Sequence, residues 1–131
     1  MTTTHPLVQA YMERKRIPGE RLRADGRLTL AIGERHRMQM QPLPGGALLF
    51  EARLAPLPAT PRPRAERIER LLRVAATRLP RHGQALAIDA TAEAFVLQQR
   101  VADGLSPVAF ERAVENFLRA LVFWHHVESQ P

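Results

Sequence analysis

The residues that could carry out chemistry are few, and their spacing does not favour a reaction. His125 and His126 are adjacent, so on a helix they diverge by about 100°, whereas two metal ligands share a face at i, i+4. The two serines are Ser106, which precedes Pro107 as a helix N-cap, and Ser129 in the tail. Neither serine has the strand–turn–helix setting of an activated nucleophile.

Motifs that hold cofactors or phosphates are missing as well. The chain has no cysteine, which excludes disulfides, a thiolate nucleophile and cysteine zinc sites. The pair Gly45-Gly46 does not open a helix, so it does not form a phosphate cradle. The acidic residues are scattered over polar faces, without a pair inside an apolar pattern. The sequence therefore predicts a protein that is not an enzyme and uses no cofactor or metal.

The charge of the chain is strongly basic. It has 19 Lys and Arg against 13 Asp and Glu, a net charge of +6, and Lys15 is the single lysine. Such a surface can attract nucleic acid, an anionic membrane or an acidic protein, or it can reflect a general bias toward arginine. Arg67, Arg70 and Arg73 alternate with Glu66 and Glu69, which can form ion pairs along a helix, and aromatics for base stacking are scarce. A small RNA- or DNA-binding domain is the alternative function.

The hydrophobic periods indicate which elements position these residues. Their order is helix, three strands, helix, two strands, helix, which is typical of an α+β domain built on one antiparallel sheet. The 131 residues suffice for a single domain over 1–131. We expect helices over 6–17, 64–79 and 107–127, and strands over 27–32, 36–41, 47–54, 85–89 and 95–101.

The sequence also suggests where the protein resides. No apolar run approaches the roughly 18–20 residues that span a membrane, and the N-terminus lacks the features of a signal peptide. We therefore expect a cytoplasmic protein.

The second predicted helix has the strongest pattern in the chain. Arg67, Arg70 and Arg78 are predicted to lie on its solvent side, with Val74 among them as a hint of a second surface. The proline-rich stretch 55–63 before it is expected to be a stiff connector. The predicted core stripe of this helix comprises Ala65, Ile68, Leu71, Leu72, Ala75 and Leu79.

Three segments, taken in order, carry a resemblance to a known family. They are 24–32 (ADGRLTLAI), a turn into the first strand; 48–58 (LLFEARLAPLP), a strand running into prolines; and 110–118 (FERAVENFL), in the helix that ends near Trp124. With the order of elements, they make the chain similar to the class I type III secretion chaperones of bacteria. Members of that family bind one effector protein before its export.

The resemblance implies a homodimer that catalyses nothing and keeps its client soluble and export-competent without ATP. The N-terminal segment of the effector would wrap around the dimer in extended form, adding strand pairing and filling hydrophobic grooves. In this family the second helix and neighbouring strands form the two-fold interface, which corresponds here to the region of Leu71, Val74 and Leu97.

Candidates for the effector groove are the apolar residues outside the core stripes, namely Val8, Met12 and Leu49. Met38 and Met40 join them if that face of the sheet is half covered, and otherwise belong to the core.

The basic charge is a departure from the family, whose members are usually acidic. It suggests an acidic effector segment, with Arg67, Arg70 and Arg78 steering its association.

Overall fold

The structure, a computed structural model, describes residues 4–32 and 36–129. Its elements follow the predicted order and confirm the α+β class. Two short 3-10 turns, Gly19–Arg21 and Pro44–Gly46, separate some of them. The helices and strands are α1 (Pro6–Lys15), β1 (Leu28–Ile32), β2 (His36–Pro42), β3 (Leu48–Pro56), α2 (Pro61–His82), β4 (Ala85–Ile88), β5 (Ala94–Val101) and α3 (Pro107–Ser129).

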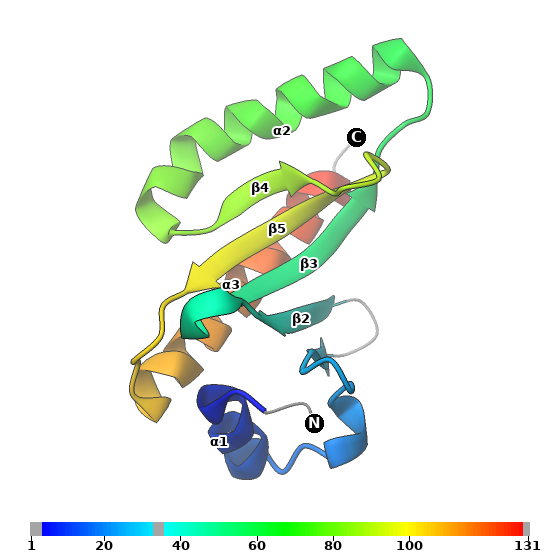
Figure 1. Ribbon diagram of the computed structural model, residues 1–131. Coiled ribbons are helices and arrows are strands. Elements are labelled where there is room, and N and C mark those ends of the chain that lie inside the picture. The colour runs from blue at the N-terminus through cyan, green and yellow to red at the C-terminus, as the bar shows by residue number, and fades with distance from the viewer. Residues whose placement is uncertain (1–3, 33–35, 130–131) are drawn as a thin grey trace.

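The five strands form one antiparallel sheet in the order β1-β2-β3-β5-β4. In Figure 1, α3 runs behind the sheet, α1 lies near its β1–β2 end, and α2 runs along the opposite end beside β4. The pairing of β3 with β5 is the longest and reaches Pro56, with a register shift between Arg53 and Ala55. The long central strands therefore provide the platform on which α3 packs.

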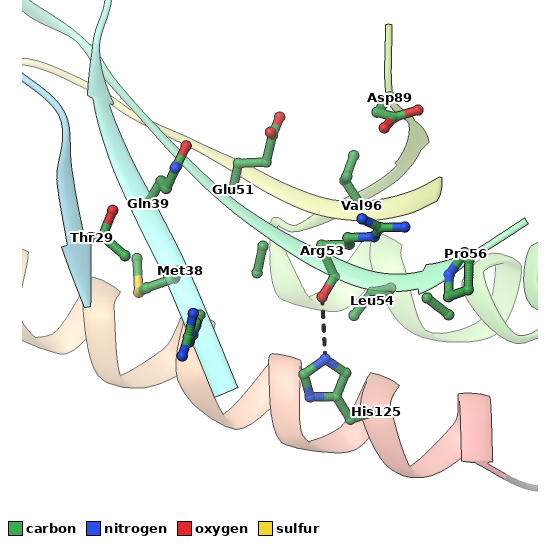
Figure 2. A pocket seen from close by; sticks show the side chains of 13 residues that line it. Thr29, Met38, Gln39, Glu51, Arg53, Leu54, Pro56, Asp89, Val96 and His125 are labelled. Carbon is green, nitrogen blue, oxygen red and sulfur yellow. Dashed lines mark hydrogen bonds between the residues drawn. The ribbon is translucent and has the colours of Figure 1, made fainter. Parts of the chain in front are cut away.

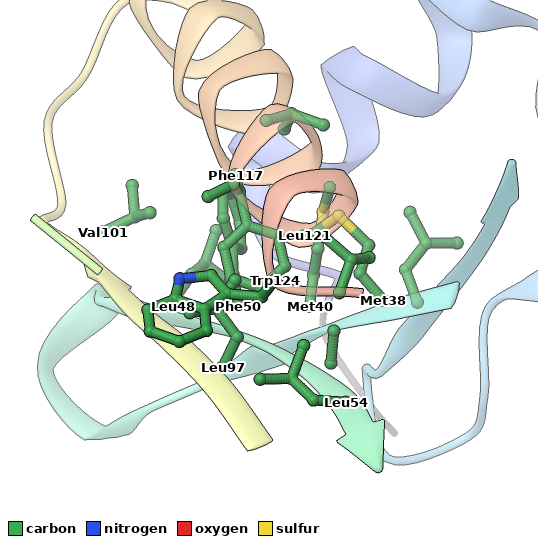
Figure 3. Close-up of a cluster of buried hydrophobic side chains, with 14 of the residues drawn as sticks. Met38, Met40, Leu48, Phe50, Leu54, Leu97, Val101, Phe117, Leu121 and Trp124 are labelled. Carbon is green, nitrogen blue, oxygen red and sulfur yellow. The ribbon is translucent and has the colours of Figure 1, made fainter. Parts of the chain in front are cut away.

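The core lies between this platform and α3, as Figure 3 shows. Phe50 on β3 is fully buried and meets Phe110 and Phe117 of α3 edge-to-face, with ring centroids 5.7 Å away in both pairs. Such contacts add to the burial of large rings, which makes this cluster a main source of stability. The burial of Trp124 continues the same stripe toward the end of α3.

Helix α1 is fixed at both ends. Its N-cap is His5, whose Nδ1 accepts from the Leu7 amide at 3.1 Å while its Nε2 donates to the Gly46 carbonyl at 2.6 Å. At the other end, Lys15 lies 2.6 Å from the carboxylate of Glu111 on α3. The helix ends at Lys15 rather than at residue 17, because Arg16 adopts a left-handed conformation with φ 53°.

The proline-rich connector is shorter than predicted. Strand β3 continues to Pro56, and α2 begins at Pro61 instead of residue 64. Pro61 and Pro63 both lie in the first turn of α2, where a helix does not need their missing N–H groups. The linking segment is therefore only 57–60, and Leu57 within it is buried.

The buried face of α2 differs from the predicted stripe. Leu71 and Ala75 are buried as expected, but Val74 packs partly against the core, whereas Leu72 is 54% exposed. Ala65 is exposed too. The helix is thus turned about its axis toward the side that carries Arg67, Arg70 and Val74. The side chain of Leu79 lies outside the part that the structure describes.

Candidate functional site

Strands β2 and β3 separate along half of their length. Their pairing runs from Gln39–Glu51 to Pro42–Leu48, while β1 pairs with β2 as far as His36. The first half of β2 and the second half of β3 therefore diverge. Figure 2 shows the resulting gap, which encloses about 600 Å³.

The wall of this gap is mixed in character. Met38 and Leu54 provide apolar surface on the side of α3, while Arg37, Arg53 and Glu51 belong to the outer, polar face of the sheet. The full lining comprises Thr29, Arg37, Met38, Gln39, Glu51, Ala52, Arg53, Leu54, Ala55, Pro56, Asp89, Val96 and His125.

A histidine from α3 lies at the floor of the gap (Figure 2). His125 Nε2 is 3.3 Å from the Arg53 carbonyl oxygen, so the imidazole donates to a backbone group of β3 beyond the stretch paired with β2. On its other side, His125 Nδ1 lies 2.7 Å from Nδ1 of His36 at the start of β2. The two rings are stacked, with centroids 4.9 Å apart and planes at 17°.

The two carboxylates of the lining are engaged by neighbours. Asp89 accepts from the Glu93 amide at 2.9 Å and the Ala94 amide at 3.2 Å, and the first of these bonds is the main reason that its pKa lies below the ordinary value. Glu51 accepts from Gln98 Nε2 at 2.7 Å. Arg37 and Arg53 are exposed and form no ion pair with another described residue. The mouth of the gap is therefore suited to an anionic or acidic ligand.

Four of the predicted groove residues are not available on the surface. Val8 and Met12 are buried in the core and not on an open groove, and Met38 and Met40 belong to the core, which is the alternative that the sequence left open for them. The alternation of a strand shows which residues share a face, but it does not show that α1 and α3 cover that face. Met38 borders the gap. Leu49 is half-buried on the outer face, as its position opposite the core predicts.

The predicted interface residues are also used within the protomer. Leu71 and Leu97 are buried in the core of a single chain, and Val74 packs partly against it, so these side chains offer little surface to a partner. Two large apolar residues are exposed on this side of the molecule, Leu72 on α2 and Ile88 on β4, at 54% and 41%. The sequence did not identify either residue, because Leu72 falls in the predicted core stripe and Ile88 in the predicted strand 85–89.

The arginines expected to steer a partner have structural roles. Arg67 forms an ion pair with Glu128, and Arg70 Nη2 donates to the Val127 carbonyl at 3.1 Å, so both fasten α2 to the end of α3. The expectation that they lie free on the solvent side is wrong. The side chain of Arg78 is outside the part that the structure describes.

The order of elements and the geometry of the sheet agree with a comparison to known protein families. Residues 16–125 match the model of the Tir chaperone protein (CesT) family. The chain belongs to this family. The CesT match spans most of the chain, and it gives no support to the nucleic-acid alternative.

Solved structures have the same fold. The HopA1–SchA chaperone–effector complex contains a chain with a TM-score of 0.71 and 17% identity, over 92% of this chain and 91% of that one. A chain of the ExsC–ExsE complex has a TM-score of 0.70 and 21% identity, over 96% of each chain. The structure of the Yersinia pestis type III secretion chaperone SycH, in complex with a fragment of YscM2, has a TM-score of 0.64 and 13% identity. The match covers 93% of this chain and 99% of that one. No curated protein sequence matches this chain significantly.

Among residues 4–32 and 36–129, no helix is long and apolar enough to cross a membrane. Over the same stretch, no group of three or more His, Asp or Glu side chains is arranged to hold a metal ion.

Proposed function

We propose that this CesT-family protein is a type III secretion chaperone that binds an extended N-terminal segment of one effector and keeps it soluble and export-competent. The observation that carries the proposal is the family match over residues 16–125. SchA in the HopA1–SchA complex and SycH in its complex with YscM2 are relatives in fold, and both are described as chaperones bound to a partner. In this proposal binding alone keeps the effector segment soluble and export-competent, so the protein catalyses nothing and needs no ATP.

The gap between β2 and β3 is the binding surface that we infer for part of this segment. An extended peptide could pair with the end of β3 there, because backbone groups in a sheet need hydrogen-bond partners. The Arg53 carbonyl faces the gap, where it accepts the long bond from His125, and a carbonyl can accept a second bond. Met38 and Leu54 would contact apolar side chains, while Arg37 and Arg53 favour an acidic segment.

The protein also forms a homodimer in this proposal, through a surface shifted from the one predicted by the sequence. Leu72 on α2 and Ile88 on β4 are large apolar side chains left exposed in one protomer, on two elements that contact each other. Strand β4 is also an edge of the sheet, where backbone groups can meet a second chain. A second copy of this chain would cover both features at once.

The proposal is tested by capturing the client from the native cytoplasm with tagged protein. The extract is treated with nuclease and kept at about 0.3 M salt, where phosphate-driven binding weakens steeply. The captured protein is then identified, and its N-terminal segment is produced and bound to the purified chain. Binding of that segment supports the proposal. Loss of every partner after nuclease treatment would favour nucleic-acid binding.

The place of binding is tested with a matched pair of charge reversals. Arg37→Glu lies at the mouth of the gap and should weaken binding of an acidic segment about tenfold or more at low salt. Arg112→Glu is an equally exposed change near the start of α3, about 20 Å along that helix from His125, and should leave binding unchanged. Equal effects of the two variants would remove the gap from the binding surface.

A further inference from the structure

The end of β3 has an open edge that is closed at one end. The ladder between β2 and β3 stops at the pair Gln39–Glu51, and beyond this pair the two strands diverge. The open edge of β3 is residues 52–56, which span about 16 Å at 3.3 Å per residue. A strand that enters the gap alongside this edge therefore meets the Gln39–Glu51 pair after about four residues.

A bound strand cannot continue in a straight line past the closed end. On the side of α3, the next residues of the ladder, Met40 and Phe50, are fully buried and fill the space below it. On the outer side, the gap extends over Gln39 as far as Thr29 of β1, and both residues belong to its lining. The chain of a bound segment must therefore turn toward the outer face of the sheet, so its paired part is short.

Two arginines lie on opposite sides of the open edge. Continuing the ladder by two residues beyond Gln39–Glu51 brings Arg37 opposite Arg53, with both side chains on the outer face. Facing side chains of neighbouring strands attract each other when their charges are opposite. A strand that lies between β2 and β3 thus has an arginine on each side at one of its outward-facing positions. A carboxylate at that position would interact favourably with both guanidinium groups.

The carboxylates of the gap do not neutralise these arginines. Glu51 accepts from Gln98 Nε2 at 2.7 Å. Asp89 feels the charge of Arg53, but it is held by backbone amides of its own turn. Within residues 4–32 and 36–129, neither Arg37 nor Arg53 forms an ion pair. Two positive charges are therefore available to a ligand in the gap.

The opposite side of a bound strand would meet a different surface. Residues on either side of an outward-facing one point to the inner face, because successive side chains of a strand alternate. Figure 2 shows Met38, Leu54 and His125 on this side of the gap. Met38 and Leu54 are themselves buried, so the inner wall is apolar and fixed in place. It favours apolar side chains at the two positions that flank the carboxylate.

We propose that the gap selects a short strand of the client with an acidic residue between Arg37 and Arg53, an apolar residue on each side of it, and a turn within about four residues. The strand pairs with the open edge of β3 through the Arg53 carbonyl, and the client chain leaves the gap over Gln39. This inference rests on the proposed function, because it names the part of the effector segment that enters the gap.

The acidic position is tested by exchanging charges with the N-terminal segment of the captured client. Each Asp and Glu of the segment is changed to Lys in turn, and its affinity for the wild-type chain and for Arg37→Glu is measured by calorimetry at low salt. We expect one acidic position whose change weakens binding to the wild type about tenfold and restores binding to Arg37→Glu to within about threefold of the original pair. Arg53→Glu should couple to the same position, which provides a second test if Arg37→Glu folds poorly.

A third arginine of the outer face provides the matched control. Arg100 on β5 is exposed and lies opposite Leu49, four residues from Val96, which is the residue opposite Arg53. This places it about 13 Å along the strands from Arg53. Arg100→Glu should weaken binding less than about twofold, and no single Lys change in the segment should restore it.

The flanking positions and the turn are tested with paired cysteines, since the chain has no cysteine of its own. A disulfide requires Cβ atoms about 4 Å apart, so it reports close neighbours. Leu54→Cys should form a disulfide with a cysteine placed next to the acidic position of the segment and not with one at that position. Gln39→Cys should react with cysteines on one side of the acidic position only, where the client chain turns outward.

The outcomes separate this inference from the proposed function. If the segment binds but no acidic position couples to Arg37 and Arg53, the inference is wrong while the chaperone proposal stands. The same holds if Leu54→Cys reacts with the acidic position itself, or if Gln39→Cys reacts on both sides of it. A segment that does not bind the chain at all would overturn both.

Discussion

Arg67 in the first half of α2 forms an ion pair with Glu128 in the last turn of α3, across 61 residues of sequence. The guanidinium also reaches the Glu128 carbonyl at 3.4 Å, and the adjacent turn of α2 adds the bond from Arg70 to Val127. These contacts explain why α2 turns its arginine-bearing side inward and leaves Leu72 outside. The same orientation of α2 thus brings Arg67 to Glu128 and leaves Leu72 exposed.

The first prediction concerns the strength of this link. Arg67→Gln should destabilise the protein by about 1–3 kcal/mol, because Glu128 is largely buried and one of its oxygens already has no partner among the described residues. Arg73→Gln removes the exposed pair with Glu69 and should change stability by less than about 0.5 kcal/mol. Urea unfolding of the two variants measures the difference. Equal midpoints would show that the link to α3 contributes nothing.

A second prediction concerns the dimer. Leu72→Arg should shift the protein from dimer to monomer in sedimentation velocity, because it places a charge at the large exposed apolar side chain that the proposed interface would cover. Val122→Arg, a change at a similarly exposed site on α3, should leave the dimer intact. A dimer that survives Leu72→Arg would exclude this face of α2 as the interface.

The third prediction is a pH dependence at the junction of α1 and α3. A hydrogen bond from Lys15 is the main cause that holds the pKa of Glu111 below its ordinary value, and the same bond raises the pKa of Lys15. A lowered carboxyl pKa stabilises the fold above the unfolded value, near 4.3, and this contribution is lost as pH falls through the folded value. The raised pKa of Lys15 stabilises the fold below the unfolded pKa, near 10.4. This stability is lost as pH rises through the folded pKa.

Thermal unfolding of Glu111→Gln against the wild type measures this linkage. The wild type should melt at higher temperature at pH 7, and the difference should vanish in acid once Glu111 is protonated. Glu115→Gln, one turn further along α3, is the control and should show a smaller difference at pH 7. If the wild type and Glu111→Gln differed in melting temperature by the same amount at pH 7 and in strong acid, this would contradict the assigned role of the Lys15 bond.

The order and type of the elements could be predicted because each depends on local patterns. The alternation of Met38 and Met40 with polar residues, and the long stripe that includes Phe110 and Phe117, are sufficient to indicate a strand and a helix. The orientation of α2 could not be predicted this way. It depends on Arg67 and Arg70 meeting the end of α3, and a helical wheel treats such arginines as solvated.

The candidate site was less accessible to sequence analysis than the fold. His36 and His125 become neighbours only through the packing of α3 under the sheet, and nothing near either residue signals the other. One signal was present for His36, since alternation places it on the same inner face as Met38. The gap itself arises where β2 diverges from β3, over the residues before Gln39, and this divergence is set by tertiary structure and not by residue type.

The most direct test of the central claim is the mass of the complex in solution. Multi-angle light scattering is applied to the purified chain, alone and with the N-terminal segment of the captured client. The account predicts a homodimer that binds one extended segment and keeps it soluble under conditions in which the free segment aggregates. A chain that stays monomeric and leaves the segment to aggregate would contradict it.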